Sequence, residues 1–228
     1  METLKETIQR LIAHYQFRIH KSIDIIRDSL RFYRKFSFLK KDLYRAWLYL
    51  NRNSFTVSNE YDWKEEAYGL DIYGETPLST LNTIAYVIQL SAQDTVYDLG
   101  SSSGRTSLFL NEFYGCKVVG VELNPEFHKK ACHVLEKYPS PGVAFQNANF
   151  FDIDYSHADV IYWYSTGLQD TGIQHFLRAL KSARKGTKII TVSVRLDTLD
   201  TENTLKMIQS IKGYYYWGKA TVYIHEKL

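Results

Sequence analysis

A strand-like run followed by very small residues carries the strongest chemical signal in this 228-residue chain. Residues 98–104 read Asp-Leu-Gly-Ser-Ser-Ser-Gly, and a helical pattern begins directly after them. Small side chains let a ligand approach the backbone closely, and the N–H groups at the start of a helix are available to bind it. The segment therefore predicts a ligand-binding loop between a strand and a helix.

An acidic residue at the end of the next expected strand adds to this signal. Glu122 follows Gly100 by 22 positions. A carboxylate at that place accepts hydrogen bonds from both hydroxyls of a ribose. The two features together predict an adenosine-containing ligand, and an accidental surface position for Glu122 is the weaker alternative.

The loop differs from a dinucleotide-binding fingerprint. A G-x-G-x-x-G pattern that starts at Gly100 requires glycine at two positions that hold Ser102 and Arg105. Asp98, just before the loop, would repel a diphosphate but would stabilise a cationic ligand. The expected ligand is therefore an adenosine that carries a positively charged, amino-acid-like group.

Alternating helical and strand patterns position these residues from about residue 76 onward. They predict a Rossmann-like α/β domain with a mostly parallel seven-stranded sheet and a C-terminal antiparallel hairpin. Ligands bind such sheets at the carboxyl ends of the strands, where residues 162–166 also lie. The expected strands are 95–99, 117–121, 143–146, 159–164, 187–194, 213–217 and 219–225, and the expected helices are 76–90, 104–114, 125–137 and 171–183.

A basic, helical segment precedes this domain. Apolar residues at three- and four-residue steps predict a helix to about residue 35, and a second helix is expected over 43–50. Residues 1–53 hold twelve Lys and Arg against five Asp and Glu, whereas residues 54–228 hold 16 against 20. We therefore divide the chain into a basic segment, 1–53, and a ligand-binding α/β domain, 54–228. A solvated helix face explains the charge most simply, and a docking surface for an acidic protein, nucleic acid or a membrane surface is the alternative.

Other classes of protein are disfavoured by composition. Cys116 and Cys132 provide no disulfide framework, and His128, Cys132 and His133 are too few for a metal site, so no metal is expected. No apolar run is long enough to span a membrane, and the N-terminus lacks the apolar block of a signal peptide. A cytoplasmic location is the expectation, while the oligomeric state is left open.

The loop and the acidic residue resemble motifs of the class I S-adenosylmethionine-dependent methyltransferases. Residues 98–104 resemble the first motif of that class, with Ser102 in place of the usual middle glycine, and residues 119–122 resemble its acidic second motif. Residues 147–150 are similar to its adenine-binding loop, in which the Asn149 carbonyl can accept from the adenine amino group. The resemblance implies S-adenosyl-L-methionine as cofactor, bound by Asp98, Gly100, Ser102, Gly104, Glu122, Asn149 and Phe150.

A narrower resemblance covers residues 72–226. Residues 72–76, Ile-Tyr-Gly-Glu-Thr, are similar to the block before the first motif in the non-SET histone-lysine methyltransferases, the disruptor-of-telomeric-silencing family. Residues 159–162 resemble the start of the fourth strand of that family, and 217–219 with 222–225 resemble its closing hairpin. This likeness implies methyl transfer to a protein lysine. It also places Tyr73, Glu75 and Thr76 at the methionine end of the cofactor, and Arg105 at the edge of its helix.

The acceptor side departs from that family, which has two asparagines where this chain has Tyr164 and Ser165. We expect these two residues to orient the nucleophile in a desolvating aromatic channel, with Tyr223 as a third candidate. Two alternatives stay open, namely that Tyr162 and Tyr164 only pack on the sheet and that Glu75 only stabilises a helix N-terminus. The sequence thus favours a protein-lysine methyltransferase over a small-molecule or RNA methyltransferase, or a non-catalytic cofactor-binding module.

Overall fold

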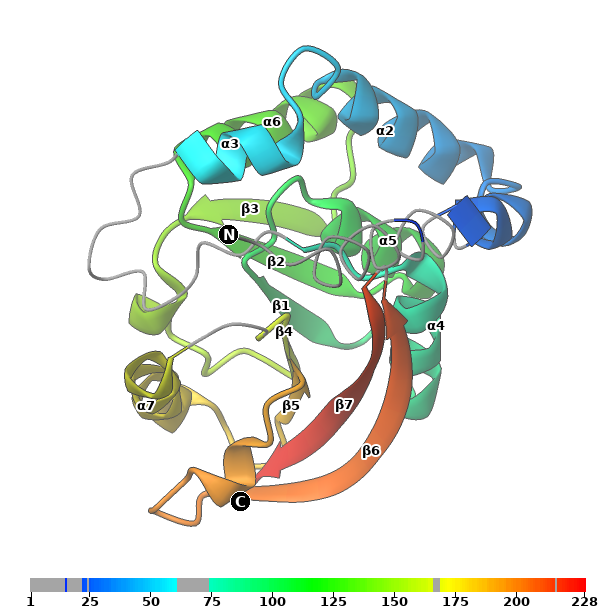
Figure 1. Ribbon diagram of the computed structural model, residues 1–228. Coiled ribbons are helices and arrows are strands. Elements are labelled where there is room, and N and C mark those ends of the chain that lie inside the picture. The colour runs from blue at the N-terminus through cyan, green and yellow to red at the C-terminus, as the bar shows by residue number, and fades with distance from the viewer. Residues whose placement is uncertain (1–14, 16–21, 24, 61–73, 166–168, 216) are drawn as a thin grey trace, which may run out of the picture.

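A seven-stranded sheet forms the centre of the molecule (Figure 1). The computed structural model describes residues 15, 22–23, 25–60, 74–165, 169–215 and 217–228. The strand order is β3-β2-β1-β4-β5-β7-β6, with β1 to β5 parallel and β7 antiparallel to both of its neighbours. This topology confirms the expected Rossmann-like fold. The strands are β1 Thr95–Leu99, β2 Lys117–Glu122, β3 Val143–Asn147, β4 Val160–Trp163, β5 Lys188–Val192, β6 Leu205–Tyr215 and β7 Gly218–Lys227.

Helices cover the two faces of the sheet and enclose two apolar cores. Successive strand residues alternate between these cores: Val96 and Tyr162 lie on the face covered by α4 and α5, and Tyr97 and Trp163 lie on the α7 face. The side chains of the neighbouring residues Tyr162 and Trp163 therefore lie on opposite faces of the sheet. The helices are α2 Phe36–Trp47, α3 Ser54–Glu60, α4 Leu78–Val87, α5 Arg105–Tyr114, α6 Pro125–Lys137 and α7 Asp170–Ala179, with short 3-10 turns η2 Phe150–Asp152, η3 Leu180–Ser182 and η4 Leu196–Thr198.

The C-terminal hairpin is longer than the sequence predicted. The expected strand 213–217 is the end of β6, which begins at Leu205 and pairs with β7 from Leu205↔Lys227 to Tyr215↔Gly218. Residues 206–212 are mostly polar or exposed, and a register shift between Met207 and Gln209 interrupts their alternation. Their strand structure depends on pairing with β7, which a local pattern does not reveal.

The second helix of the N-terminal segment packs on the domain rather than extending from it. This helix, α2, was expected over 43–50 but lies over Phe36–Trp47. Its buried side includes the polar residues Lys41, Asp42 and Arg45 as well as Phe38, so an apolar pattern does not reveal where the helix begins. Phe38 contacts the rings of Phe109 and Phe113 on α5, with centroids 5.7 and 5.4 Å away. Lys41 donates to Glu112 at 2.7 Å and to Ser140 at 2.6 Å. Part of the positive charge of the segment is thus paired within the chain.

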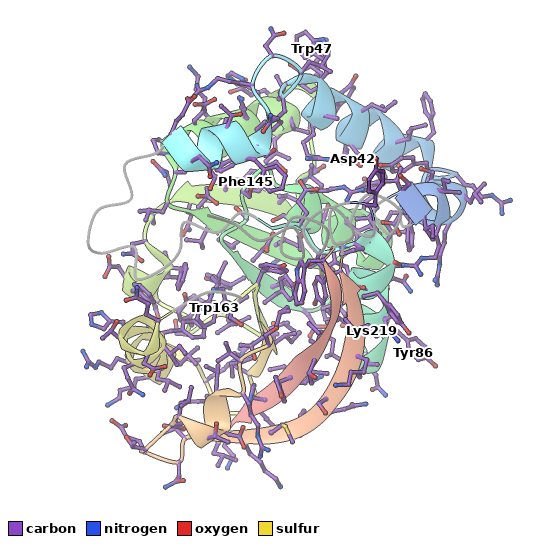
Figure 2. All side chains as sticks on the ribbon, in the orientation of Figure 1. Asp42, Trp47, Tyr86, Phe145, Trp163 and Lys219 are labelled. Carbon is purple, nitrogen blue, oxygen red and sulfur yellow. The ribbon has the colours of Figure 1, made fainter. Side chains whose placement is uncertain are left out.

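The remainder of the segment is described only in part. Residues 22–23 and 25–32 are helical, and most of the helix expected before residue 35 lies outside the described residues. Within the described part of the chain, no helix is long and apolar enough to cross a membrane. Figure 2 shows that Trp47 points away from the domain, whereas Asp42 lies on the inner side of α2.

Candidate cofactor and active site

The loop after β1 turns sharply through three residues in the left-handed region. Gly100 has a φ of 69°, Ser102 of 52° and Gly104 of 80°. A side chain at Gly104 would also collide with the ring of Phe145. Left-handed backbone favours glycine and costs other residues about 1 kcal/mol. The middle position of the motif therefore prefers glycine for a conformational reason, and Ser102 adopts that conformation despite its side chain.

Two buried carboxylates support this loop from below. Glu122 accepts hydrogen bonds from the backbone N–H groups of Ser102, at 2.7 Å, and of Asn124, at 2.8 Å. Asp98 accepts from the Ser107 hydroxyl at 2.6 Å. Burial, with a smaller contribution from the Asp98 charge, raises the pKa of Glu122 to about 7, and burial raises that of Asp98 to about 6. Such a pair attracts a positively charged ligand.

A pocket opens along the loop at the carboxyl ends of β1 and β4. Asp98 and Tyr162 are direct neighbours across these two strands, and the Tyr162 hydroxyl contacts the Thr76 hydroxyl at 2.5 Å. The structure thus brings together most of the predicted cofactor residues and Tyr164. The pocket is lined by Gly74, Glu75, Thr76, Asp98, Leu99, Gly100, Ser101, Ser102, Ser103, Arg105, Thr106, Tyr162 and Tyr164.

The loop also carries polar groups that a bound cofactor could use as hydrogen-bond partners. The side-chain hydroxyls of Ser101 and Ser102 are buried and have no hydrogen-bond partner among the described residues. An added Cβ at Gly100 would meet nothing within 4 Å, so the space over the loop is open. A buried hydroxyl without a partner is unfavourable, and a polar ligand in that space would satisfy it. The residues present are therefore suited to hold S-adenosylmethionine.

Glu75 is held at the edge of the loop by two arginines. Arg45 of α2 donates to its carboxylate at 3.1 Å, and Arg105 lies 3.8 Å from it. Arg45 also donates to the Ser103 hydroxyl at 3.0 Å. Glu75 thus lies within a charged cluster at the pocket rather than only at a helix N-terminus. The part played by Arg45 was missed, because it is 30 residues from Glu75 in the sequence.

Two aromatic side chains of the closing hairpin lie beside Tyr164, which lines the pocket. Trp217 donates through Nε1 to the Tyr164 hydroxyl at 2.7 Å. Tyr215 stacks on Trp217 with ring centroids 5.5 Å apart and an interplanar angle of 16°. Gly74 lies against the Tyr164 ring, since an added Cβ there would come within 2.7 Å of it. The closing hairpin therefore brings Trp217 and Tyr215, neither of them a predicted site residue, against Tyr164.

Two residues predicted to orient the nucleophile, Ser165 and Tyr223, make contacts elsewhere in the sheet. The Ser165 hydroxyl donates to Val192 O at 2.7 Å and accepts from Val192 N at 3.1 Å, so it joins the ends of β4 and β5. Tyr223 pairs with Thr191 across the sheet and lies beside His225, away from the pocket residues.

The predicted adenine loop also makes internal contacts. Asn149 caps η2 by accepting from Phe151 N at 3.0 Å. Phe150 is 4% exposed, and its ring packs against Trp163 at 5.6 Å in the core beneath α7. Tyr73 lies outside the described residues. The roles of Ser165, Tyr223, Asn149, Phe150 and Tyr73 stay predictions.

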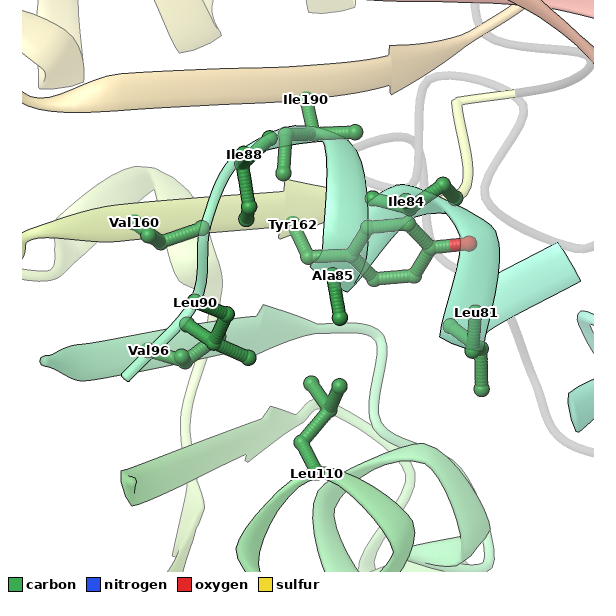
Figure 3. A pocket seen from close by; sticks show the side chains of 10 residues that line it. All are labelled: Leu81, Ile84, Ala85, Ile88, Leu90, Val96, Leu110, Val160, Tyr162 and Ile190. Carbon is green, nitrogen blue, oxygen red and sulfur yellow. The ribbon is translucent and has the colours of Figure 1, made fainter. Parts of the chain in front are cut away.

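A second pocket lies behind Tyr162, in the core beneath α4 (Figure 3). The Tyr162 hydroxyl is the only polar side-chain group on its lining, and this hydroxyl is bonded to Thr76. An otherwise apolar lining, whose one hydroxyl is already hydrogen-bonded, offers no free group that would recognise a polar ligand. The pocket is therefore a feature of core packing. Its other lining residues are Leu81, Ile84, Ala85, Ile88, Leu90, Val96, Leu110, Val160 and Ile190.

Known proteins resemble this chain in sequence and in fold. Residues 56–214 match the family model of histone methylation protein DOT1. A protein-lysine N-methyltransferase from Saccharolobus islandicus is 28% identical over 139 residues, which is 59% of this chain and 84% of that protein.

Solved structures support the same fold. An RNA methyltransferase from Salinibacter ruber in complex with S-adenosyl-L-homocysteine has a TM-score of 0.56 and 23% identity, covering 67% of this chain and 93% of the other. A geranyl diphosphate methyltransferase in complex with S-adenosylmethionine has a TM-score of 0.56 and 13% identity, covering 66% and 85%. The family match extends over most of the domain, including the Gly100–Gly104 loop, Glu122 and Tyr164. The chain therefore belongs to the DOT1 family of class I S-adenosylmethionine-dependent methyltransferases.

Proposed function

We propose that the methyl acceptor of this enzyme is a lysine side chain of a protein. The observation that carries the proposal is an aromatic cluster in which Trp217, Tyr215 and Tyr164 lie next to one another. Tyr164 also lines the pocket together with Asp98 and Glu75. An aromatic channel accepts a long aliphatic side chain that carries one nitrogen at its end. The similarity to a protein-lysine N-methyltransferase agrees with this choice of acceptor.

The chain contributes binding and orientation to the reaction. S-adenosylmethionine, when bound, supplies a methyl group that is activated by a sulfonium leaving group. Asp98 lines the pocket, and its carboxylate favours such a cationic donor. Tyr164 is fixed in direction by the hydrogen bond from Trp217, so it orients the incoming amine.

The same aromatic residues would prepare the nucleophile. A lysine ammonium has no lone pair, and it must lose a proton before it can react. Removal from water disfavours the charged form of an amine and lowers its pKa. Burial raises the pKa of the Tyr215 phenol, so this ring adds no negative charge to the channel. The channel therefore favours the neutral amine over the ammonium ion.

The basic N-terminal segment would dock the protein partner. An acidic partner for the basic N-terminal segment is a prediction from the charge of residues 1–53. Lys41 and Arg45 are engaged in internal ion pairs. The docking surface would therefore use other basic residues of the segment.

Labelling with a tritiated methyl donor tests the acceptor class. The purified protein is incubated with a cell lysate and with tritiated S-adenosylmethionine, and labelled protein bands are hydrolysed for amino-acid analysis. Label in methylated lysine supports the proposal. Label in RNA, in small molecules or in another amino acid would overturn it, and a Tyr164→Phe variant should label less strongly than the exposed control Tyr86→Phe.

A further inference from the structure

A helix from outside the region that matches the DOT1 family reaches the candidate cofactor pocket. The matched region begins only at residue 56, whereas α2 ends at Trp47. Arg45, in the last turn of α2, is buried and donates through Nη1 to the Glu75 carboxylate at 3.1 Å and to the Ser103 hydroxyl at 3.0 Å. Both acceptors line the pocket, and the Ser103 hydroxyl lies 3.4 Å from the same Glu75 oxygen. One guanidinium group thus joins the segment before α4 to the loop after β1.

Asp42, one turn earlier on the inner side of α2, fixes the direction of that guanidinium group (Figure 2). Its carboxylate accepts from Arg45 Nε at 2.6 Å, from Arg105 Nε at 3.2 Å and from the Tyr33 hydroxyl at 2.5 Å. Arg105, the first residue of α5, lines the pocket and lies 3.8 Å from the Glu75 carboxylate. Hydrogen bonds between charged groups are strong and directional, and these three charged side chains are buried. Asp42 therefore holds both arginines at the pocket.

A second carboxylate of the N-terminal segment anchors the same pocket segment from its other end. Asp28 is 1% exposed and accepts from the backbone N–H groups of Leu78, at 2.9 Å, and Ser79, at 3.0 Å. These are the first two residues of α4, whose own N-cap residue makes no side-chain hydrogen bond. The first N–H groups of a helix have no partner within it, so a distant carboxylate that accepts from them acts as the cap. The segment that carries Glu75 is thus fixed by Asp28 where α4 begins and by α2 at Glu75 itself.

The energetic consequence of these contacts concerns side-chain freedom at the pocket. A glutamate side chain has many rotamers, and fixing it in one of them costs conformational entropy. Arg45 restricts Glu75 before any ligand arrives, since the guanidinium group is itself held by Asp42. A ligand that meets a side chain already in position does not bear that cost, and its affinity rises accordingly.

We propose that the N-terminal segment preorganises the cofactor site through three positioning residues, Asp28, Asp42 and Arg45. Arg45, held by Asp42, sets the directions of Glu75 and Ser103, and Asp28 fixes the start of α4. The three residues act through the residues of the pocket. The segment is therefore a part of the enzyme that binds the methyl donor, whatever the identity of the methyl acceptor.

A double-mutant cycle between Arg45 and Glu75 tests the positioning role. Calorimetric titration of the full-length protein with S-adenosylhomocysteine, well below the thermal midpoint of each variant, should show about a tenfold loss of affinity in Arg45→Gln. Arg45→Lys should recover part of the loss, because an ammonium group can still pair with Glu75. In a Glu75→Gln background, Arg45→Gln should cost less than about twofold more, since its action passes mainly through Glu75.

The exposed Arg34→Gln variant is the control for loss of a positive charge from the same segment. Wild-type affinity in Arg45→Gln would overturn the proposal, and so would losses that multiply in the cycle. In steady state the KM for the donor should rise with kcat largely kept. A fall in kcat with that KM unchanged would also contradict a role in donor binding.

Asp28→Ala tests the anchor at α4. Loss of the cap should lower the thermal midpoint and weaken S-adenosylhomocysteine binding about threefold, and Asp28→Asn, which keeps one acceptor oxygen, should restore most of the affinity. Asp154→Ala is the matched control, because Asp154 also accepts from a backbone N–H group, that of Ser156, but is exposed and absent from the pocket lining. An Asp28→Ala variant that melts earlier yet binds with wild-type affinity would show that Asp28 stabilises the fold without positioning the pocket.

Discussion

Glu122 accepts a hydrogen bond from the backbone N–H of Ser102, with 2.7 Å between Oε2 and the nitrogen. The bond joins the end of β2 to the middle of the loop after β1. The other carboxylate oxygen accepts from Asn124 N, directly before α6. One buried carboxylate thus orients both segments that meet at the predicted ribose position.

Loss of this carboxylate should weaken cofactor binding without unfolding the protein. Glu122→Ala removes hydrogen bonds to a charged group, and we expect a loss of roughly 1–3 kcal/mol, or about 5- to 150-fold in Kd. Calorimetry with S-adenosylhomocysteine measures the change, with the exposed Glu136→Ala variant as control. Equal affinities in wild type and Glu122→Ala would remove Glu122 from the cofactor site.

Cofactor binding should depend on pH and release protons. With pKa values raised to about 7 and about 6, Glu122 and Asp98 are partly protonated in the empty protein near pH 6. A cationic ligand favours the ionised carboxylates, so S-adenosylmethionine affinity should rise from pH 5.5 to about pH 8 and then level off. Calorimetry in two buffers of different ionisation enthalpy measures the released protons, and an absence of release at pH 6.5 would contradict this account.

The same carboxylates should make the stability of the empty protein fall with pH. The folded pKa of Glu122 lies above its ordinary value of 4.5, so the folded state binds more protons than the unfolded state between about pH 4.5 and 7. The stability that Glu122 contributes is present below that range and is lost as the pH rises through it. Thermal melts of wild type and Glu122→Gln across this range measure the effect, which the neutral glutamine should reduce.

The backbone of Ser102 should respond to substitution in a characteristic order. Because φ is 52° at this position, Ser102→Gly should relieve about 1 kcal/mol of backbone strain, offset in part by the greater freedom of glycine in the unfolded chain. Ser102→Val should destabilise, since a β-branched side chain is least suited to left-handed backbone. Urea unfolding measures both variants. A valine variant as stable as the glycine variant would show that the loop does not hold this conformation.

Tyr164 should affect turnover and leave the cofactor affinity intact. Tyr164→Phe removes the hydroxyl that accepts from Trp217, and the expected loss of turnover is about tenfold. Trp217→Phe should lower turnover in the same direction, because it removes the donor of that bond. Steady-state labelling rates and calorimetry separate the two effects. An equal loss of affinity would place Tyr164 at the cofactor instead.

Local patterns in the sequence determined the fold and predicted the centre of the candidate cofactor site. The strands and helices from Thr95 to Val192 lie within two residues of their expected starts, because alternating apolar periods describe segments that are buried on both sides. Asp98, Gly100 and Glu122 follow from the spacing of two strand ends, which the parallel fold brings together.

Only the tertiary structure decided which other residues join them. Ser165 turns its hydroxyl to Val192 and Phe150 enters the core under α7, because the register and packing of distant strands set those directions. Arg45 reaches Ser103 across 58 positions, and Trp217 reaches Tyr164 across 53. Such contacts depend on long-range packing of α2 and the closing hairpin. A periodic pattern in the sequence indicates which face of a helix or strand is buried, but it does not identify the residues that pack against that face.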